Sequence, residues 1–156
     1  MKNKLLILIP AVLVILVAGI GAFLLLTKSA TFNLDEQYYG NAELTLISAD
    51  KLQRLVDDKS SFAVFVSQPA CRASADFEKV LQSFIAKYPM KFYEIAFSDL
   101  KNLSFAENVR FYPSFLIFEK GKLVDLLEAD SDDDAGAYTS LDDFETWFTK
   151  QVTLQE

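Results

Sequence analysis

An uncharged apolar run of 22 residues, Leu5 to Leu26, divides this 156-residue chain into two unequal parts. At about 1.5 Å per residue, such a run makes a helix of roughly 33 Å, which is long enough to cross the hydrocarbon core of a bilayer. The residues that follow are numerous enough for one compact domain with its own core. The sequence therefore predicts one transmembrane segment and one soluble domain.

The flanks of this run favour an uncleaved signal anchor. A signal peptide has an apolar stretch of about 7–15 residues followed by small residues at its cleavage site. Here the run is longer and residues 27–30 make a poor site, so cleavage is the less favoured alternative. Lys2 and Lys4 precede the run, and only Lys28 follows it closely. The positive-inside rule then predicts a cell-membrane protein with residues 1–4 in the cytoplasm and the domain on the extracytoplasmic side.

Composition excludes several classes of function. Histidine is absent, which removes Ser-His-Asp triads and His-ligated metals. Cys71 is the single cysteine, so no intramolecular disulfide can form, and the glycines do not have the spacing of a phosphate-binding loop. From residue 31 onward, 12 basic residues stand against 22 acidic ones, a net charge of −10. We therefore expect no cofactor, no metal and no nucleic-acid partner, and we expect membrane contact through the N-terminal segment alone.

Apolar strands and amphipathic helices alternate along residues 44–156. Strands are predicted at 44–47, 62–66, 92–97, 115–118 and 123–127, and helices at 48–59, from Cys71 to residue 88, at 104–109, and from Ser140 onward. Alternation in the first half predicts parallel strands with helices on both faces, and a turn at residues 119–122 adds an antiparallel hairpin. The predicted fold class is α/β, a three-layer α/β/α sandwich with a mixed sheet, preceded by one transmembrane helix. Residues 27–43 are predicted to be a juxtamembrane linker.

Three features in this order resemble the thioredoxin-like superfamily, over roughly residues 44–152. An apolar strand at 62–66 leads into a loop with Cys71 at the start of a long helix. Tyr112-Pro113-Ser114 precedes an apolar strand, like the cis-proline of that family, and residues 119–124 match the hairpin that follows it. The resemblance implies a thioredoxin-like fold for residues 44–156, with Cys71 and Pro113 at its site.

The sequence departs from the family at the site itself. The family's Cys-x-x-Cys is Cys71-Arg72-Ala73-Ser74 here, a CxxS motif that keeps the first cysteine and lacks the second. The residue before the cysteine, commonly tryptophan, is Ala70. The buried acid of thioredoxins would fall near Phe65, so that carboxylate is missing. One cysteine cannot release its own mixed disulfide, which excludes the ordinary dithiol reaction.

A cysteine at a helix N-terminus is favoured as the thiolate by the helix dipole and by free backbone N–H groups. Ser74 could donate a hydrogen bond to that thiolate, and Arg72 adds a neighbouring positive charge. If the family geometry holds, Pro113 leaves the backbone of Tyr112 free to pair with an extended polypeptide. We assign Cys71, Ser74 and Pro113 as candidate catalytic residues, and Ala70, Arg72 and Tyr112 as candidate substrate-binding residues.

Two hypotheses of function remain open, and the sequence does not decide whether the protein is an enzyme. In the first, Cys71 forms mixed disulfides with protein thiols or disulfides, as an isomerase or holding factor does. In the second, the domain is a redox-silent binding or scaffold module at the membrane surface, since a lone cysteine is often a small buried hydrophobe. An intermolecular Cys71–Cys71 dimer is an option, and the oligomeric state is open.

The segment 128–139 is rich in aspartate, with Asp130, Asp132 and Asp134 at alternate positions. An EF-hand loop requires glycine at its sixth position and glutamate at its twelfth, and this segment has Ala135 and Leu141 there. An EF-hand is therefore rejected. A solvated acidic loop is the favoured interpretation, and a weak extracellular calcium site is the alternative.

Overall fold

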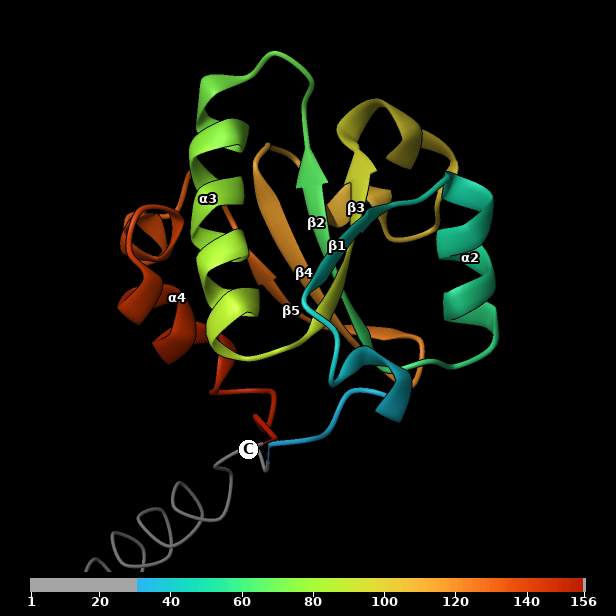
Figure 1. The fold of residues 1–156 in the computed structure, drawn as a ribbon. Coiled ribbons are helices and arrows are strands. Elements are labelled where there is room, and N and C mark those ends of the chain that lie inside the picture. Colours follow the sequence, from blue (N-terminus) through green and yellow to red (C-terminus); the bar gives the residue numbers. More distant parts are fainter. Residues whose placement is uncertain (1–30, 156) are drawn as a thin grey trace, which may run out of the picture. The chain divides into compact units, whose positions relative to one another are not determined.

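The computed structural model describes residues 31–155, whose strands form one five-stranded sheet (Figure 1). The strands are β1 (Glu43–Leu46), β2 (Phe62–Ser67), β3 (Lys91–Ala96), β4 (Ser114–Glu119) and β5 (Lys122–Leu127). The predicted cytoplasmic tip, residues 1–4, and the predicted anchor, residues 5–26, lie outside the described residues. Within residues 31–155, no helix combines the length and the apolar character needed to span a bilayer.

The strands are ordered β1-β3-β2-β4-β5 and form a mixed sheet, as predicted. β3 lies between β1 and β2 and pairs with both in parallel. β4 runs antiparallel to β2 and to β5. β2 is buried along its whole length because strands flank it on both sides and helices cover both faces, which confirms the expectation drawn from its continuous apolar run.

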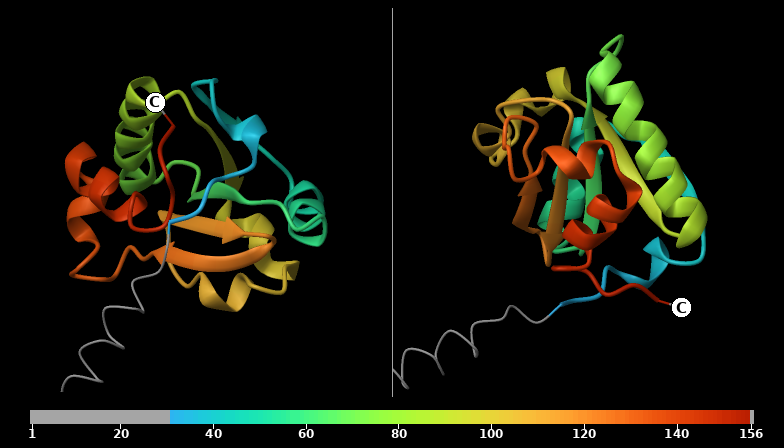
Figure 2. Two further views of the ribbon diagram at one scale, coloured as in Figure 1. Left: turned by 90° about the horizontal axis from the view of Figure 1, so that it is seen from below. Right: turned by 90° about the vertical axis from the view of Figure 1, so that its left-hand side faces the viewer.

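Three α-helices cover the sheet: α2 (Ala49–Asp57), α3 (Arg72–Lys87) and α4 (Leu141–Phe148). α3 and α4 lie on one face and α2 lies on the other, which gives the predicted three layers (Figure 2). Ser140 is the N-cap of α4, and its hydroxyl accepts a hydrogen bond from the Asp143 N–H at 3.3 Å. Each helix turns its apolar stripe toward the sheet, so the core lies on both sides of it.

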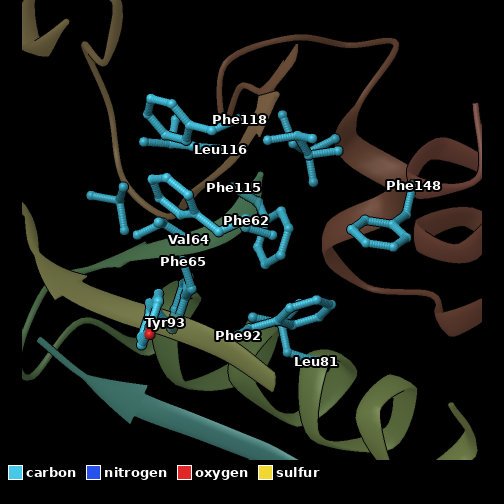
Figure 3. Packing of buried hydrophobic residues seen from close by; sticks show 14 of the residues in the cluster. Phe62, Val64, Phe65, Leu81, Phe92, Tyr93, Phe115, Leu116, Phe118 and Phe148 are labelled. Atoms are coloured by element: carbon cyan, nitrogen blue, oxygen red, sulfur yellow. The ribbon is translucent and has the colours of Figure 1, made fainter. Parts of the chain in front are cut away.

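The core between the sheet and the α3–α4 pair is mainly aromatic. Six fully buried phenylalanines form this aromatic layer: Phe77, Phe84, Phe92, Phe115, Phe144 and Phe148. Figure 3 shows Phe92, Phe115 and Phe148 converging from β3, β4 and α4. The ring centroid of Phe92 lies 5.1 Å from that of Phe115 and 5.5 Å from that of Phe148. At this spacing aromatic rings attract one another in addition to the stabilisation that burial provides. Phe77 and Phe84 of α3 and Phe144 of α4 complete the layer.

The hairpin between β4 and β5 depends on a glycine. Gly121 has φ +75°, and a Cβ placed there would lie 2.2 Å from the backbone oxygen of Val56. The same close approach lets the Gly121 N–H donate to the Ser60 carbonyl at 2.8 Å. Glycine therefore supplies both the turn conformation and the space for α2 to pack beside the hairpin.

The predicted linker at 27–43 differs from the structure, because the chain is part of the domain from Thr31. The backbone N–H of Phe32 donates to Gln151 at 2.8 Å, and its carbonyl accepts from Thr153 at 2.9 Å. Leu34 and Tyr38 are 3 % and 1 % exposed. A short 3₁₀ helix, η1 (Glu36–Tyr38), lies between Thr31 and β1 in the chain. The apolar residues of this segment follow neither a helix nor a strand period, because their side chains pack against elements that are distant in the sequence.

The predicted helix at 104–109 is also shorter than expected. The segment between β3 and β4 contains two 3₁₀ helices, η2 (Phe97–Asn102) and η3 (Ala106–Asn108), and another, η4 (Ala135–Tyr138), lies between β5 and α4. Leu100, Leu103 and Phe105 are nevertheless buried against the sheet. A tight 3₁₀ turn suits such a segment because it covers the sheet without the length that an α-helix needs.

Candidate active site

The segment Ser67–Ser74, which we call the thiol corner, joins the end of β2 to the start of α3. The Cys71 N–H donates to the Gln68 carbonyl at 3.1 Å and closes a tight turn. Ala70 within it has φ +61°, a conformation in which a non-glycine residue is strained. The turn leaves Cys71 as the N-cap of α3 with extended backbone angles, φ −86° and ψ 122°. The predicted position of Cys71 at a helix N-terminus is confirmed.

The environment of Cys71 favours the thiolate. The thiol is partly exposed, and Cys71 is the N-cap of α3, whose first N–H groups have no carbonyl partner in the helix. The backbone N–H and hydroxyl of Ser74, with a smaller contribution from the backbone of Ala73, lower the pKa of the Cys71 thiol below its usual value. Burial of the sulfur acts in the opposite direction and does not reverse the effect. Access and a lowered pKa are the two properties that a reactive cysteine requires.

Ser74 links the thiol to the loop before it. Its side chain is buried, with the residue 5 % exposed, and its Oγ accepts a hydrogen bond from the backbone N–H of Gln68 at 3.1 Å. Ser74 therefore holds the turn in place, and its hydroxyl is one of the groups that lower the pKa of the Cys71 thiol.

Arg72 pairs with an acidic residue of its own helix. Its side chain is 96 % exposed, and its Nε lies 3.6 Å from the carboxylate of Asp76 one turn further along α3. The Arg72 charge is not among the causes of the lowered pKa of the Cys71 thiol. The position of Arg72 leaves it free to contact a bound partner, which is the role the sequence predicted.

The Tyr112–Pro113 peptide bond is cis, as the resemblance implied. Ser114, the next residue, pairs with Val66 near the end of β2, so Pro113 lies at the same end of the sheet as the thiol corner. Ser114 Oγ donates to the Phe111 carbonyl at 2.9 Å and fixes the turn before β4. Within residues 31–155, the backbone of Tyr112 makes no hydrogen bond to another backbone group. It is therefore available to an added extended segment.

Sequence reasoning named Tyr112 but missed the exposed ring of Phe111 beside it. Phe111 and Tyr112 are 44 % and 41 % exposed, although both are large and apolar. Tyr112 packs on one side against Phe97 of η2, with ring centroids 5.0 Å apart. Paired aromatic side chains beside a free backbone edge provide an apolar surface for a polypeptide.

A cleft of about 550 Å³ opens on the α3 side of the sheet, next to the thiol corner. Its lining includes Phe65 and Ser67 of β2, Cys71, Ser74 and Glu78 around the start of α3, and Glu94 of β3. The volume is within the ~300–1,000 Å³ that is usual for ligand sites. The thiol therefore lies at the edge of a concave surface.

The carboxylate of Glu94 is the second feature that the sequence did not reveal. Glu94 pairs with Phe65 in the β2–β3 register, which is the position where the resemblance implied that an acid was missing. Ser67 Oγ donates to Glu94 Oε1 at 2.6 Å, and the Glu94 side chain is half-buried in the cleft. A strand-to-strand register is needed to place this glutamate near Cys71, so its sequence position gave no signal.

The acidic loop presents no metal site of three ligands, and neither does any other part of residues 31–155. Asp134 uses its Oδ2 to accept a hydrogen bond from the backbone N–H of Glu128 at 3.1 Å. That contact gives one of the alternating aspartates a local structural role. The structure thus adds no support to the alternative of a calcium site.

Comparison with known proteins places this geometry in a common fold. A thioredoxin from Nicotiana alata superposes with a TM-score of 0.56 and 18 % sequence identity, over 73 % of this chain and 96 % of that chain. Thioredoxin O1 from Arabidopsis thaliana gives 0.52 and 11 %, over 70 % and 98 %. A thioredoxin pre-protein from Schistosoma mansoni gives 0.53 and 17 %, over 70 % and 99 %. The domain has a thioredoxin-like fold.

No protein-family model matches the sequence, and no curated protein matches it either. Identities of 11–18 % carry information about the fold alone. Within the thioredoxin-like fold, Cys71 and cis-Pro113 lie at one end of the sheet, and Ser74 lies in the first turn of α3, three residues after Cys71.

Proposed function

We propose that this protein acts through the single thiol of Cys71, forming mixed disulfides with protein substrates. The observation that carries the proposal is a partly exposed cysteine at a helix N-terminus whose pKa is lowered by the neighbouring Ser74 groups. A structural cysteine gains nothing from this arrangement. The proposed activity is thiol–disulfide exchange in the manner of an isomerase or a holding factor.

The exchange balances without any further reactant. The Cys71 thiolate attacks one sulfur of a substrate disulfide, a Cys71–substrate S–S bond forms, and the other substrate sulfur leaves as a thiolate that takes a proton from water. A different thiolate of the same substrate then attacks the mixed disulfide. That step forms a new substrate disulfide and returns Cys71 as the thiolate, so no net oxidation or reduction occurs.

The surroundings of the thiol support a polypeptide substrate. The backbone of Tyr112 is available for pairing, and Phe111 and Tyr112 offer apolar surface at the same end of the sheet as the thiol corner. With Ser74 in place of a resolving cysteine, the mixed disulfide persists until a second thiol arrives. A long-lived covalent complex suits isomerisation and holding better than rapid reduction.

We further propose that residues 5–26 anchor the protein in the cell membrane, with the domain on the extracytoplasmic side. The support is the uncharged run of 22 residues together with the excess of lysine before it. An oxidising extracytoplasmic compartment is where protein disulfides form and persist. The location and the thiol chemistry are therefore consistent with each other.

The test is to trap covalent partners in intact cells that express the full chain. Rapid acid quenching and alkylation preserve mixed disulfides, which appear as reducible high-mass species on non-reducing gels. We expect such species with the wild-type chain and their complete loss with Cys71→Ser. Ser83→Ala, an exposed change on the outer side of α3, is the control and is expected to keep them.

Absence of any Cys71-dependent species, with the domain folded and the chain in the membrane, would contradict the thiol function. It would favour the redox-silent scaffold instead. A species that resolves into two copies of the chain alone would identify a Cys71–Cys71 dimer rather than an exchange protein.

A further inference from the structure

The cleft beside Cys71 contains carboxylates that have no part in the proposed thiol chemistry. Two of its lining residues, Glu78 of α3 and Glu94 of β3, carry carboxylates. Arg72 also lines it, but the Arg72 side chain is 96 % exposed and its Nε lies 3.6 Å from Asp76. Among the residues whose side chains the structure describes, no lysine or arginine forms an ion pair with Glu78 or Glu94.

Glu94 is held rather than free. Its Oε1 accepts a 2.6 Å hydrogen bond from Ser67, whose side chain is buried with the residue 8 % exposed. Glu94 is half-buried and is neighboured on the two adjacent strands by Phe65 and Leu46 in the sheet register. The carboxylate therefore has a fixed position and a reduced contact with water, which strengthens its attraction for a cation.

Much of the remaining lining is apolar, although Ser67, Gln68 and Ser74 also contribute to it. Leu46, at the edge strand β1, is 68 % exposed and lines the cleft together with Phe65 and Ala75. Lysine and arginine combine a long apolar stem with a charged end, and such side chains lie along apolar surface while the charge reaches a polar partner. Apolar walls with carboxylates among them fit that shape better than they fit a neutral or acidic side chain.

We propose that this cleft binds a lysine or arginine side chain of the substrate polypeptide, close to the substrate's reactive sulfur. The inference rests on the proposed thiol function and adds the substrate class, a cysteine flanked by basic residues. From residue 31 onward the chain is acidic, with 12 basic and 22 acidic residues, so a basic segment is also attracted to it over a longer range. Glu94 is the specificity residue, and Glu78 supports it.

The experiment measures exchange between the full chain, in a non-ionic detergent, and short peptides whose one cysteine carries a chromophoric thiol as a mixed disulfide. Three peptides differ only in the residue next to cysteine: lysine, norleucine or glutamate. We expect the lysine peptide to transfer to Cys71 about two- to fivefold faster than the norleucine peptide, as for a partly exposed ion pair, and the glutamate peptide to be slower. The advantage should shrink at high salt.

Variants assign the effect to the cleft. Glu94→Gln is expected to bring the lysine-to-norleucine rate ratio close to one, and Glu94→Lys is expected to favour the glutamate peptide. Glu36→Gln removes the same charge from the exposed η1 helix, at the far end of the sheet from the thiol corner (Figure 1), and should leave the ratio as in wild type. The wild-type ratios and their salt dependence need no variant, so the test stands even if a substitution prevents folding.

The outcomes separate the two proposals. Equal wild-type rates for the three peptides would overturn the basic-side-chain site and leave the thiol function intact. A preference for lysine that survives in Glu94→Gln and is lost in Glu36→Gln would also overturn the site, because general charge would explain it. No transfer from any peptide would overturn the thiol function, and the substrate assignment with it.

Discussion

The aromatic layer and the thiol corner share helix α3, yet their residues differ in burial and in the kind of contact they make. In the aromatic layer, Phe77, Phe84 and their partners are fully buried and packed ring against ring. In the thiol corner, Pro69 and Ala70 are exposed, Ala70 is strained at φ +61°, and polar groups make the contacts. The contrast indicates that stability is supplied by one region and reactivity by the other.

If that division is correct, substitutions can separate the two properties. Unfolding can be followed by the fluorescence of Trp147, the single tryptophan, which is 7 % exposed and packs at 5.9 Å from Phe144. Thiol reactivity can be followed by the alkylation rate of Cys71. Each variant of the full chain is then measured on both scales.

Phe84→Ala is expected to have the largest effect on stability. Its ring contacts Phe92, Phe144 and Phe148, and its loss leaves a cavity that the packed layer cannot close. The free energy of unfolding in urea should fall by about 3–5 kcal/mol. In the remaining folded protein the pKa of Cys71 should stay as in wild type. Phe111→Ala, at a 44 % exposed position, is the control and should change stability by less than about 0.5 kcal/mol.

Gly121→Ala should have the next largest effect on stability. It tests the packing of the hairpin at the end of the sheet opposite the thiol corner. The added methyl meets the Val56 carbonyl and the residue has φ +75°, so we expect a loss of about 2–3 kcal/mol. Gly40→Ala is a matched control, because Gly40 has φ +85° with no atom within 4 Å of the new methyl. It should cost about 1–2 kcal/mol, the backbone contribution alone. Equal losses for both variants would contradict the close approach of α2 to the hairpin.

Ser74→Ala should change the reactivity of the thiol more than the stability of the fold. It removes the acceptor for the Gln68 N–H and the hydroxyl that favours the thiolate, so stability should fall by only about 1 kcal/mol. The pKa of the Cys71 thiol should rise toward its ordinary value, and alkylation near neutral pH should slow. Ser74→Cys supplies a second thiol in the same place and should let the protein release its own mixed disulfides. An unchanged alkylation profile in Ser74→Ala would show that the helix terminus alone sets the thiol's pKa.

The smallest effect is expected at the outer ion pair between α3 and α4. Lys87 Nζ lies 2.7 Å from one carboxylate oxygen of Glu145, and the Tyr88 hydroxyl donates a hydrogen bond to the other oxygen. Both contacts hold the pKa of the Glu145 carboxyl below its usual value. A lowered carboxyl pKa stabilises the fold above the ordinary pKa, and the contribution is lost as pH falls through the folded value. Glu145→Gln should therefore lower Tm by about 1–2 °C at pH 7 and bring no further penalty in acid. If the difference in Tm between wild type and variant stays constant from pH 7 to pH 3, this ion pair is excluded as the cause of the difference.

The sequence predicted the parts of the fold that repeat a period or a fixed turn. The amphipathic pattern up to residue 88 identified α3, and the apolar run at 62–66 identified β2. These signals are local, because a helix face and a buried strand each leave their pattern in consecutive residues. The cis bond before Pro113 was expected from the family resemblance.

The features that escaped prediction depend on contacts between distant residues. The segment from Thr31 joins the domain through the backbone of Gln151 and Thr153, and nothing near Thr31 in sequence indicates those partners. Glu94 reaches the cleft only through its register with Phe65, 29 positions earlier in the chain. Cys71, Ser74 and Pro113 were found because the family resemblance carries an order of motifs, whereas Phe111 and Glu94 belong to this chain's own site.

The measurement that tests the central claim most directly is the rate of Cys71 alkylation as a function of pH, in the folded full chain and in the same chain unfolded in urea. The backbone N–H groups at the helix N-terminus and the Ser74 hydroxyl lower the pKa of the folded thiol, so its rate should reach half-maximum at a lower pH than in the unfolded chain, which should titrate near the ~8.5 of an ordinary cysteine. A thiol that reacts only after unfolding, or that titrates at the same pH in both states, would contradict a reactive monothiol and leave the domain as a redox-silent scaffold.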